Sequence, residues 1–344
     1  MTFHIGILGG GNISQTHARA ASAIDGARVV AVCGQNTEKV NAMAATCGAR
    51  AYEEVQAFFA HRPMEVVLIG SPSGLHAEQG IEAARRGLHV LVEKPLAITT
   101  EQADALIDAC ERAGVKLGVF FQDRVAPDLI KLKQFIAAGQ LGKPFLASAR
   151  VKWYRPPEYY AGSRWRGTWA LDGGGALMNQ GIHTVDLLLW LMGEAGVVWA
   201  RAITARHNIE VEDTLVAALQ FAGGALGTLE ATTSVYPGYP RRIEVSGALG
   251  TIIVENDRVT RADLRSASLD WVAQPEQAAD ERAVSPVISD AHGHRRIIED
   301  FLQAIATDSR PLCDGREARR SVALVEAIYE SARAGGSSFN KFTS

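Results

Sequence analysis

Short apolar runs alternate with amphipathic stretches over residues 1–122 of the chain. The runs are rich in Val, Ile and Leu, which is typical of strands buried on both faces of a parallel sheet, and the stretches between them have the hydrophobic spacing of helices. The predicted strands are Phe3–Leu8, Arg28–Cys33, Glu65–Ile69, Leu88–Val92 and Lys116–Val119, and the predicted helices are Asn12–Ala23, Thr37–Cys47, Gly74–Arg86 and Thr100–Ala113. This alternation predicts right-handed crossovers and a doubly wound α/β sheet.

The pattern changes after residue 122. One helix is predicted at Pro127–Ala138, followed by strands at Phe145–Tyr154, Val197–Ala205, Thr214–Phe221, Leu226–Val235, Arg241–Val245 and Thr251–Glu255. Several gaps between these strands contain glycine, as hairpins do, so the sheet is expected to be mainly antiparallel. A polar surface segment is predicted at Leu264–Pro286, and two closing helices at Ala291–Ala306 and Gly315–Ala334.

These patterns predict two domains. Residues 1–122 are expected to form a Rossmann dinucleotide-binding domain, and residues 123–344 an α+β domain with a large, mainly antiparallel open sheet. The C-terminal helices of the second domain are the elements that would pack back on the first domain.

Composition narrows the function classes. The 344 residues include 47% hydrophobic and 21% charged residues, as in globular proteins, and 35 Lys and Arg against 38 Asp and Glu give a net charge of −3. We therefore expect no nucleic-acid partner, and the absence of a long apolar run predicts no membrane partner. The four cysteines contain no Cys-x-x-Cys pair, and a strand begins directly after Met1-Thr2. A cytoplasmic protein without a signal peptide, a disulfide framework or a metal is expected.

The first strand runs into Gly9-Gly10-Gly11-Asn12-Ile13-Ser14, a Gly-x-Gly-x-x-Ser sequence at a strand-to-helix turn. Gly9 permits the tight turn, Gly11 allows close approach of a pyrophosphate, and the helix that begins there directs free N–H groups at the anion. A tight turn without a ligand is the alternative. In the first turn of a parallel α/β pattern, the motif favours a bound dinucleotide.

The second strand ends without the acidic residue that usually binds the adenosine ribose of NAD. The sequence there is Cys33-Gly34-Gln35-Asn36-Thr37-Glu38-Lys39. Backbone N–H groups with Gln35, Asn36 and Lys39 would instead accept a 2′-phosphate, although the usual arginine is missing. The cofactor is therefore predicted to be NADP or NAD, with NADP favoured.

Two further segments carry candidate chemistry. Glu93-Lys94-Pro95 follows a predicted parallel strand, so Lys94 points to the crevice where ligands bind in such sheets, unless the turn is simply solvated. The glycine-rich segment Asp172–Asp186 leads into an apolar helix, and Asn179 and His183, four residues apart, are expected to share one face of that helix. His183 near a helix start favours a neutral imidazole, as a general base requires, and Asp186 is expected to orient it or to act as a cap. A satisfied core histidine is the alternative.

Together these motifs resemble the Gfo/Idh/MocA family of NAD(P)-dependent sugar and cyclitol oxidoreductases. The matching segments are residues 6–14, Glu93–Pro95 and Gly181–Asp186, with weaker matches at residues 121–124, 141–144 and 314–319. The resemblance covers nearly the whole chain. It implies a Rossmann domain followed by an α/β domain whose open sheet packs against another subunit, giving a homodimer or homotetramer. It also implies that this second domain binds substrate and forms the subunit contacts.

The resemblance assigns the catalytic lysine to Lys94 and the catalytic histidine to His183. The family often has Asp four residues before that histidine, where this chain has Asn179, which forms hydrogen bonds but does not take up a proton. Lys94 and His183 are then expected to share the proton transfer. The sequence Met178–His183 also resembles the variant in some relatives that act on nucleotide-linked or other modified sugars.

The candidate site residues follow from the motifs and the resemblance. The predicted cofactor contacts are Gly9, Gly11, Asn12, Ile13, Gly34, Gln35, Asn36, Lys39, Ser71, His76, Glu93, Lys94, Gln122, Trp165 and Arg166. The predicted substrate contacts are Lys94, Tyr154, Arg155, Asn179, His183 and Tyr236, with Arg155 suited to an anionic substrate or to ordinary surface placement. The segment His207–Asp213 is rich in potential metal ligands but predicts no metal site on a turn between strands. His292 and His294 are expected to be solvated or to cap a helix.

The predicted function is hydride transfer between a nicotinamide cofactor and a secondary alcohol or ketone carbon of a sugar, cyclitol or nucleotide-sugar substrate. Two alternatives come from other classes. One is a dinucleotide-binding regulator without turnover, which has no need of both Lys94 and His183. The other is a non-redox glycosidase with tightly bound NAD, which releases no reduced cofactor.

Overall fold

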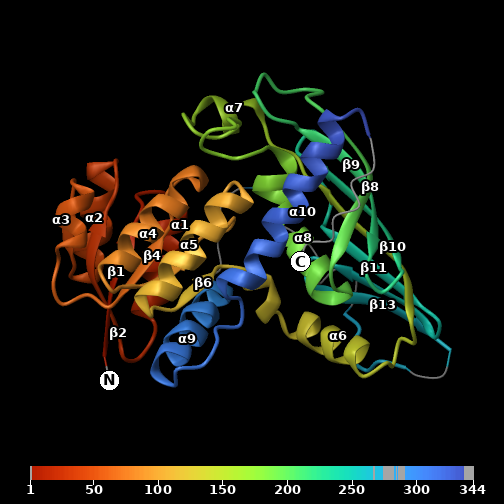
Figure 1. Cartoon of the computed structure of the whole chain (residues 1–344), viewed down its shortest axis with the longest axis horizontal. Helices are drawn as coiled ribbons and strands as arrows, with labels where there is room; N and C mark the ends of the chain where they lie inside the picture. Colours follow the sequence, from red (N-terminus) through yellow and green to blue (C-terminus); the bar gives the residue numbers. More distant parts are fainter. Residues whose placement is uncertain (1, 266–267, 274–282, 284, 286–290, 337–344) are drawn as a thin grey trace. The chain divides into compact units, whose positions relative to one another are not determined.

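A computed structural model describes residues 2–265, 268–273, 283, 285 and 291–336. The chain forms two compact units. The first consists of the described residues of Met1–Gln122 and Val287–Arg319, and the second of those of Asp123–Pro286 and Arg320–Ser344. The Rossmann prediction and the antiparallel-sheet prediction are both confirmed, one in each unit (Figure 1).

The first unit contains a six-stranded parallel sheet in the order β3-β2-β1-β4-β5-β6. Its strands are β1 (Phe3–Leu8), β2 (Ala27–Cys33), β3 (Arg50–Tyr52), β4 (Val66–Ile69), β5 (His89–Val92) and β6 (Leu117–Val119). The order reverses at β1, so the carboxyl ends of β1 and β4 flank the crevice where such sheets bind ligands. Five of the six strands lie where the apolar runs predicted them.

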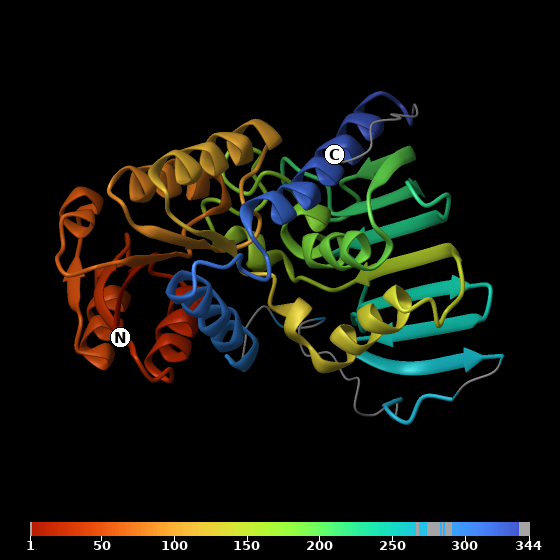
Figure 2. The same ribbon diagram turned by 60° about the horizontal axis from the view of Figure 1, so that its bottom comes forward.

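Helices pack on both faces of this sheet. They are α1 (Asn12–Ser22), α2 (Thr37–Cys47), α3 (Val55–Phe59), α4 (His76–Arg85), α5 (Thr100–Ala113) and α9 (His292–Ala306). Helices α4 and α5 lie together on one face, and α1 and α9 on the other (Figure 2). The short elements β3 and α3 were not predicted, because three and five residues are too few to show a hydrophobic period.

The segment around α9 completes the first unit. A Cβ added at Gly118 of β6 would lie 2.7 Å from the ring of Phe301 in α9, so the helix packs closely on the edge strand. The N–H of Val119 donates to the carbonyl of Cys313, and Gly118 forms an antiparallel bridge with Asp314. A segment near the end of the chain thus covers β6, which would otherwise be an open sheet edge.

The second unit contains a seven-stranded sheet in the order β13-β12-β11-β7-β10-β9-β8. Only β7 and β10 pair in parallel. The strands are β7 (Pro144–Lys152), β8 (Ala195–Ile203), β9 (Thr214–Phe221), β10 (Leu226–Thr232), β11 (Arg242–Gly247), β12 (Gly250–Glu255) and β13 (Arg258–Leu264). Strand β13 was not predicted, because Arg and Asp at alternate positions conceal its apolar side chains. The rest of the predicted polar segment lies mostly outside the described residues.

Helices cover one face of this sheet. They include α6 (Pro127–Ala137), α8 (Ile182–Met192) and the part of α10 (Gly315–Arg333) that belongs to this unit (Figure 2). A short helix α7 (Pro157–Ala161) and a π-helix η3 (Ala176–Gly181) lie in the loops. The opposite face carries exposed apolar side chains, and no helix of the described part of the chain covers it. In the part of the chain that the structure describes, no helix has the length and apolar character needed to cross a bilayer.

Candidate active site

The glycine loop, residues 9–11, joins β1 to α1 in the first unit. Gly11 and Asn12 are exposed, Ile13 is partly exposed, and a Cβ added at Gly11 would meet open space. The first N–H groups of α1 have no partners within the helix, so they are available to an anion. The loop therefore presents an open helix N-terminus, the arrangement that binds a pyrophosphate.

The turn after β2 packs against the glycine loop. A Cβ added at Gly34 would lie 2.6 Å from a backbone nitrogen of that loop, so only glycine allows the two turns to approach this closely. Asn36 caps α2 by accepting the N–H of Lys39 at 2.9 Å. Gln35 and the Lys39 side chain are exposed. Gly34 and Asn36 thus shape the turn, and the two exposed side chains remain as candidate contacts for an adenosine ribose or its phosphate.

Gln122 stands at the carboxyl end of β6. Its Oε1 atom is buried and accepts no hydrogen bond from the described residues. A buried acceptor without a donor costs free energy, which a donor on a ligand would recover. A nicotinamide dinucleotide brings both a pyrophosphate and a carboxamide N–H, so the open helix N-terminus and the Gln122 amide fit this class of cofactor.

Glu93 is buried at the end of β5 between two histidines. Its Oε1 lies 2.9 Å from Nε2 of His17 in α1 and 3.5 Å from Nε2 of His294 in α9. Burial by itself would raise the pKa of Glu93, but its interactions with the two histidines hold that pKa well below the usual range. The other oxygen accepts the N–H of Lys94 at 3.2 Å. Glu93 is therefore a fixed carboxylate that anchors the Lys94 turn, and its contact with the cofactor stays a prediction.

The position of His294 corrects the expectation that it is solvated or caps a helix. It is 2% exposed, because it lies on the buried face of α9 with Ile297, Ile298 and Phe301. Burial also lowers the pKa of His17, which stacks on Phe120 with ring centroids 4.3 Å apart. The three ligand atoms of this cluster lie within 4.8 Å of one another; a hydrogen bond joins His17 to Glu93, and His294 lies at ion-pair distance from Glu93.

Ser71 and His76 follow β4. Nδ1 of His76 lies 2.7 Å from the carbonyl oxygen of Pro95, and Nε2 lies 3.0 Å from that of Ser71. The Ser71 hydroxyl donates to Oε1 of Gln79 at 2.6 Å. His76 is buried, which lowers its pKa. Its ring therefore connects the turn after β4 to the Lys94–Pro95 turn, and both ring nitrogens face the backbone rather than a ligand.

In the second unit, Asn179 belongs to a chain of hydrogen bonds. Its Nδ2 donates to Oδ1 of Asp172, and its Oδ1 accepts from Nε2 of Gln180 at 2.6 Å. The oxygen of Gln180 accepts from Nη2 of Arg155 at 2.9 Å. Asn179 lies in the π-helix η3 rather than in the regular helix that was predicted. A carboxylate thus stands next to Asn179, and the side chain is held from both sides.

His183 is the second residue of α8, and its side chain is 12% exposed. Its Nδ1 lies 3.5 Å from Oδ2 of Asp123, which also accepts a hydrogen bond from Nη1 of Arg241 at 2.5 Å. The position at the start of the helix agrees with the prediction. The carboxylate that faces the ring is therefore Asp123, at ion-pair distance from Nδ1.

Asp186 does not orient His183, so that prediction is wrong. Its side chain is 1% exposed and accepts two hydrogen bonds from Arg124, at 2.8 Å from Nε and 2.7 Å from Nη2. The hydroxyl of Ser321 in α10 donates to it as well. Positions i and i+3 lie on the same side of an α-helix, so the spacing alone would permit the pair; Arg124 and Ser321 instead bind the Asp186 carboxylate in the interior.

Aromatic side chains surround the same segment. The guanidinium of Arg166 lies 4.4 Å from the centre of the Tyr159 ring and 5.2 Å from that of Trp165. The Tyr159 hydroxyl accepts from Nε2 of Gln180 at 3.0 Å. Trp165 and Arg166 are partly exposed, as a ligand contact requires. The predicted Trp-Arg pair therefore lies beside the Asn179 hydrogen-bond chain.

The remaining predicted substrate contacts differ in exposure. Tyr236 is 76% exposed, and its ring stands perpendicular to that of Tyr154 with centroids 5.3 Å apart. Arg155 is 1% exposed, which excludes the surface placement. It donates to the carbonyl of Tyr154 and to Gln180, which connects it to the Asn179 hydrogen-bond chain, and its contact with substrate stays a prediction. The two tyrosines remain candidate contacts.

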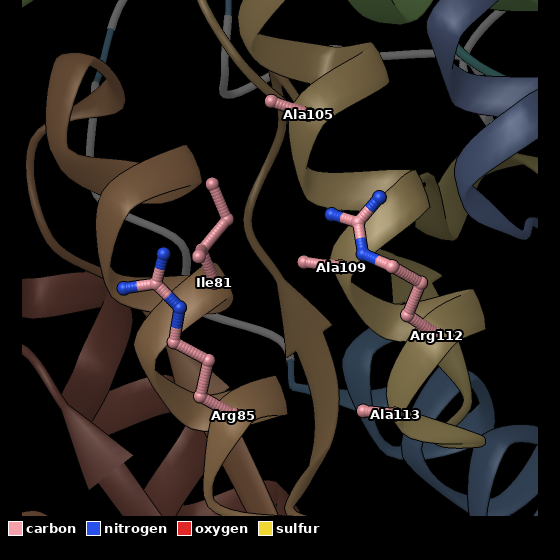
Figure 3. Close-up of a pocket in the computed structure, with 6 residues that line it drawn as sticks. All are labelled: Ile81, Arg85, Ala105, Ala109, Arg112 and Ala113. Atoms are coloured by element: carbon pink, nitrogen blue, oxygen red, sulfur yellow. The ribbon is translucent and has the colours of Figure 1, made fainter.

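A groove of about 400 Å³ lies between α4 and α5 in the first unit (Figure 3). Its lining consists of Ile81, Arg85, Ala105, Ala109, Arg112 and Ala113. The arginine side chains extend along its two walls in Figure 3. It contains no acid–base group and no predicted site residue, so it is not the catalytic site.

Two site residues were missed in the sequence. Asp123 lies in the weak family match at residues 121–124 but was not predicted to be a site residue. Its position shortly after β6, at the carboxyl ends of the parallel strands, was the signal that would have identified it. Glu212, in the segment with clustered metal-ligand residue types, is buried and binds the backbone of the glycine-rich turn before η3. The neighbouring Asp213 accepts N–H groups of residues 205–207. Both carboxylates therefore accept hydrogen bonds from backbone N–H groups. The ring of His207 packs against Tyr160.

Comparisons with known proteins agree with this geometry. Residues 3–121 match the model of an oxidoreductase family with an NAD-binding Rossmann fold, and residues 129–253 match the GFO/IDH/MocA C-terminal domain. The WlbA dehydrogenase from Bordetella pertussis, solved in complex with NADH and UDP-GlcNAcA, is 35% identical. The match covers 99% of this chain and 98% of that one, with a TM-score of 0.88.

Two further relatives show the range of the family. The WlbA dehydrogenase from Chromobacterium violaceum, also with NADH and UDP-GlcNAcA, is 32% identical over 98% of this chain and 96% of that one, with a TM-score of 0.87. A myo-inositol 2-dehydrogenase from Thermotoga maritima is 29% identical over 74% of this chain and 76% of its own length. The predicted family is thereby confirmed: the chain belongs to the GFO/IDH/MocA family and is an oxidoreductase with a Rossmann domain for a nicotinamide cofactor.

Proposed function

We propose that the protein transfers hydride between a secondary alcohol carbon of a nucleotide-linked sugar and a nicotinamide cofactor. The observation that carries the proposal is Lys94, which stands at the carboxyl end of β5 on a turn anchored by the buried carboxylate of Glu93. The WlbA relatives, in complex with NADH and UDP-GlcNAcA, support the substrate class. The exposed pair Trp165 and Arg166 and the ring of Tyr236 supply stacking and anion-binding groups for such a substrate.

The proposed mechanism divides the chemistry between cofactor and protein. Bound NAD(P) supplies the hydride acceptor. In the oxidation direction His183 takes the proton of the substrate hydroxyl, and Asp123 stabilises the imidazolium that forms. Lys94 donates a hydrogen bond to the substrate oxygen and stabilises its developing charge. Asn179, held by Asp172 and Gln180, positions the hydroxyl without taking up a proton.

The first test is the absorbance of reduced nicotinamide after mixing protein, NAD or NADP and a substrate panel. The panel contains nucleotide-linked uronic acids, free sugars, uronates and inositols. We expect a signal with a nucleotide-linked sugar that is lost in Lys94→Ala, while cofactor binding is retained. The matched control is Lys116→Ala. Lys116 lies at the amino end of β6, whereas Lys94 lies at the carboxyl end of the neighbouring strand β5, and Lys116 pairs with Asp308.

Other results would contradict the proposal. A signal of wild-type size in Lys94→Ala would remove Lys94 from the mechanism. Cofactor binding without turnover on the whole panel would favour a regulator. Product formation without released reduced cofactor, in protein that retains nucleotide through purification, would favour the glycosidase. A signal only with inositols or free sugars would refute the nucleotide-linked sugar as the substrate and would assign the substrate to one of those classes.

For the cofactor, we propose a preference for NADP. The exposed Gln35 and Lys39 after β2, with no acidic residue at the strand end, support it. The two WlbA relatives were solved with NADH, which is the alternative to this preference. The ratio of kcat/KM for NADP to that for NAD distinguishes the two possibilities. We expect Gln35→Asp to lower kcat/KM for NADP and to leave that for NAD within about twofold. A wild-type ratio that favours NAD would refute the preference.

We also propose that a second copy of the chain covers the open face of the seven-stranded sheet. Leu146 and Leu226, opposite each other on β7 and β10, are 45% and 56% exposed, and Val216 on β9 is 40% exposed. Large contiguous apolar patches on a surface mark interaction sites. Light scattering of the purified protein is expected to give a dimer or tetramer that Leu226→Arg dissociates. A wild-type monomer would refute this interface.

The structure supports a cytoplasmic location, which we propose as well. All four cysteines are described and none forms a disulfide, as is usual in a reducing compartment. Cell fractionation with an antibody tests it, and recovery from a secreted fraction would refute it.

A further inference from the structure

Glu212 lies at the end of the β8–β9 loop and is only 5% exposed. Its Oε2 accepts the N–H of Gly175 at 2.9 Å, and its Oε1 accepts the N–H of Leu177 at 2.8 Å. The hydroxyl of Tyr329 in α10 donates to Oε1 at 2.9 Å. One buried carboxylate therefore accepts hydrogen bonds from the two residues that flank the start of η3 and from a helix distant in the sequence.

The backbone of Glu212 contacts the same turn. Its carbonyl accepts the N–H of Ala176 at 3.0 Å, so three consecutive N–H groups, 175–177, bind this one residue. A Cβ added at Gly175 would lie 1.7 Å from that carbonyl oxygen, which no side chain permits. The glycines before η3 thus allow the turn to lie directly on Glu212. The N–H groups that a helix start leaves without partners are satisfied by a single side chain and its carbonyl.

We propose that Glu212 is a positioning residue for the reaction: it fixes the start of η3 and thereby the placement of Asn179 and His183. The inference rests on the proposed function, because it assumes that these two residues act on the substrate. Asn179 lies two residues beyond the last anchored N–H, and η3 continues directly into α8, which carries His183. A displacement of this turn therefore moves both groups relative to the sugar.

The chemistry of the three donors explains why a carboxylate is needed. Two N–H groups and one O–H group face Glu212, and an ionised carboxylate offers enough lone pairs for all of them. Burial raises the pKa of Glu212 to about 7, although the hydrogen bonds from Leu177, Tyr329 and Gly175 act against this shift. A glutamine of the same shape has one acceptor oxygen, and its NH₂ group would face an N–H donor.

The test compares Glu212→Gln and Tyr329→Phe with wild type and a control. The control is Asp128→Asn, because Asp128 is a buried carboxylate of the same unit that accepts a backbone N–H, from Val259, away from η3. We expect Glu212→Gln to lower kcat by about 10²-fold, the effect of a displacement of about 1 Å at reacting groups, with the KM for cofactor unchanged. Tyr329→Phe retains the two backbone bonds of Glu212 but loses the hydroxyl that donates to Glu212 and accepts the N–H of Met178 at 3.3 Å, and it is expected to lose less. Asp128→Asn is expected to keep wild-type kcat.

A second measurement does not depend on turnover. Hydrogen–deuterium exchange of peptides covering residues 172–181 is expected to be slow in wild type and faster in Glu212→Gln and Tyr329→Phe. If Glu212→Gln does not fold, Tyr329→Phe supplies both readouts. Wild-type kcat or unchanged exchange in a folded Glu212→Gln, or unchanged exchange in Tyr329→Phe if the first does not fold, would overturn the inference. Absence of Lys94-dependent turnover in wild type would instead overturn the proposed function, and the exchange data would still decide whether Glu212 anchors the turn.

Discussion

Replacing Asp186 by Asn tests whether this residue supports the fold or the chemistry. Asp186 and Arg124 are 1% and 2% exposed and share two hydrogen bonds of 2.8 and 2.7 Å. The amide of Asn offers one acceptor and places an NH₂ group against the guanidinium, so the buried Arg124 loses the carboxylate that accepts its two hydrogen bonds. Loss of one partner of such a pair costs about 3–5 kcal/mol, which is about 10 °C in Tm for a unit of this size.

The assay is urea and thermal unfolding of Asp186→Asn, followed by turnover at a temperature at which the variant stays folded. We expect a large loss of stability with kcat within about threefold of wild type, because the carboxylate beside His183 is Asp123. The control is the double variant Arg124→Met/Asp186→Leu, in which both charges are removed and much of the stability returns. Wild-type stability with lost turnover in Asp186→Asn would refute the reasoning and restore Asp186 as the partner of His183.

Three other predictions concern the first unit. Glu93→Gln is expected to lower stability at pH 7 and still at about pH 4, and the loss is expected to shrink only at lower pH, because a carboxylate whose folded-state pKa lies well below its ordinary value of 4.5 keeps most of its contribution until the pH approaches that lowered pKa. Urea unfolding at about pH 7, 4 and 2 measures this, and a difference that does not change with pH would contradict it. Gly34→Ala is expected to weaken cofactor binding about tenfold or more, because its Cβ displaces the glycine loop. The control is Gly223→Ala, whose Cβ meets open space. Calorimetry measures both affinities, and equal values would show that the turn after β2 moves to accommodate the methyl group. Iodoacetamide is expected to modify Cys47 before Cys33 in the native protein, because burial raises the pKa of Cys33 to about 11; peptide mass spectrometry measures the order, and equal rates would argue against it.

The sequence predicted the parts of the fold that depend on local periodicity. The bounds of β1, α2, α5 and β9 agree with the apolar pattern to the residue, because each element has a buried face and clear flanking turn residues. Strand β13 was missed since an alternation of charged and apolar residues at a sheet edge resembles a loop. The π-helix η3 was taken as a regular helix, because its wider turn is set by Glu212 and Tyr329, which are distant in the sequence.

The candidate site shows the same division. Lys94 and the glycine loop were identified because strand ends are local features that topology places at one edge of the sheet. The carboxylate beside His183 was not, since Asp186 is near in sequence and Asp123 is near in space. His294 was placed in solvent for a related reason: its partner Glu93 is two hundred residues away along the chain. Sequence patterns identify the side chains that belong to a motif. The residues from other elements that contact those side chains can be identified only from the three-dimensional structure.

The return of the chain to β6 has a consequence for how the protein is made. The first 122 residues leave the ribosome long before α9 and the segment that binds Val119. Until Cys313 and Asp314 are synthesised, the edge of β6 lacks its partner, and until His294 is synthesised, Glu93 faces one of its two histidines. The nucleotide-binding unit therefore reaches its final form only after these later residues have joined it. A fragment cut at residue 122 would leave that edge open to pairing with other chains, so a recombinant version of this unit needs residues 291–319 joined to it.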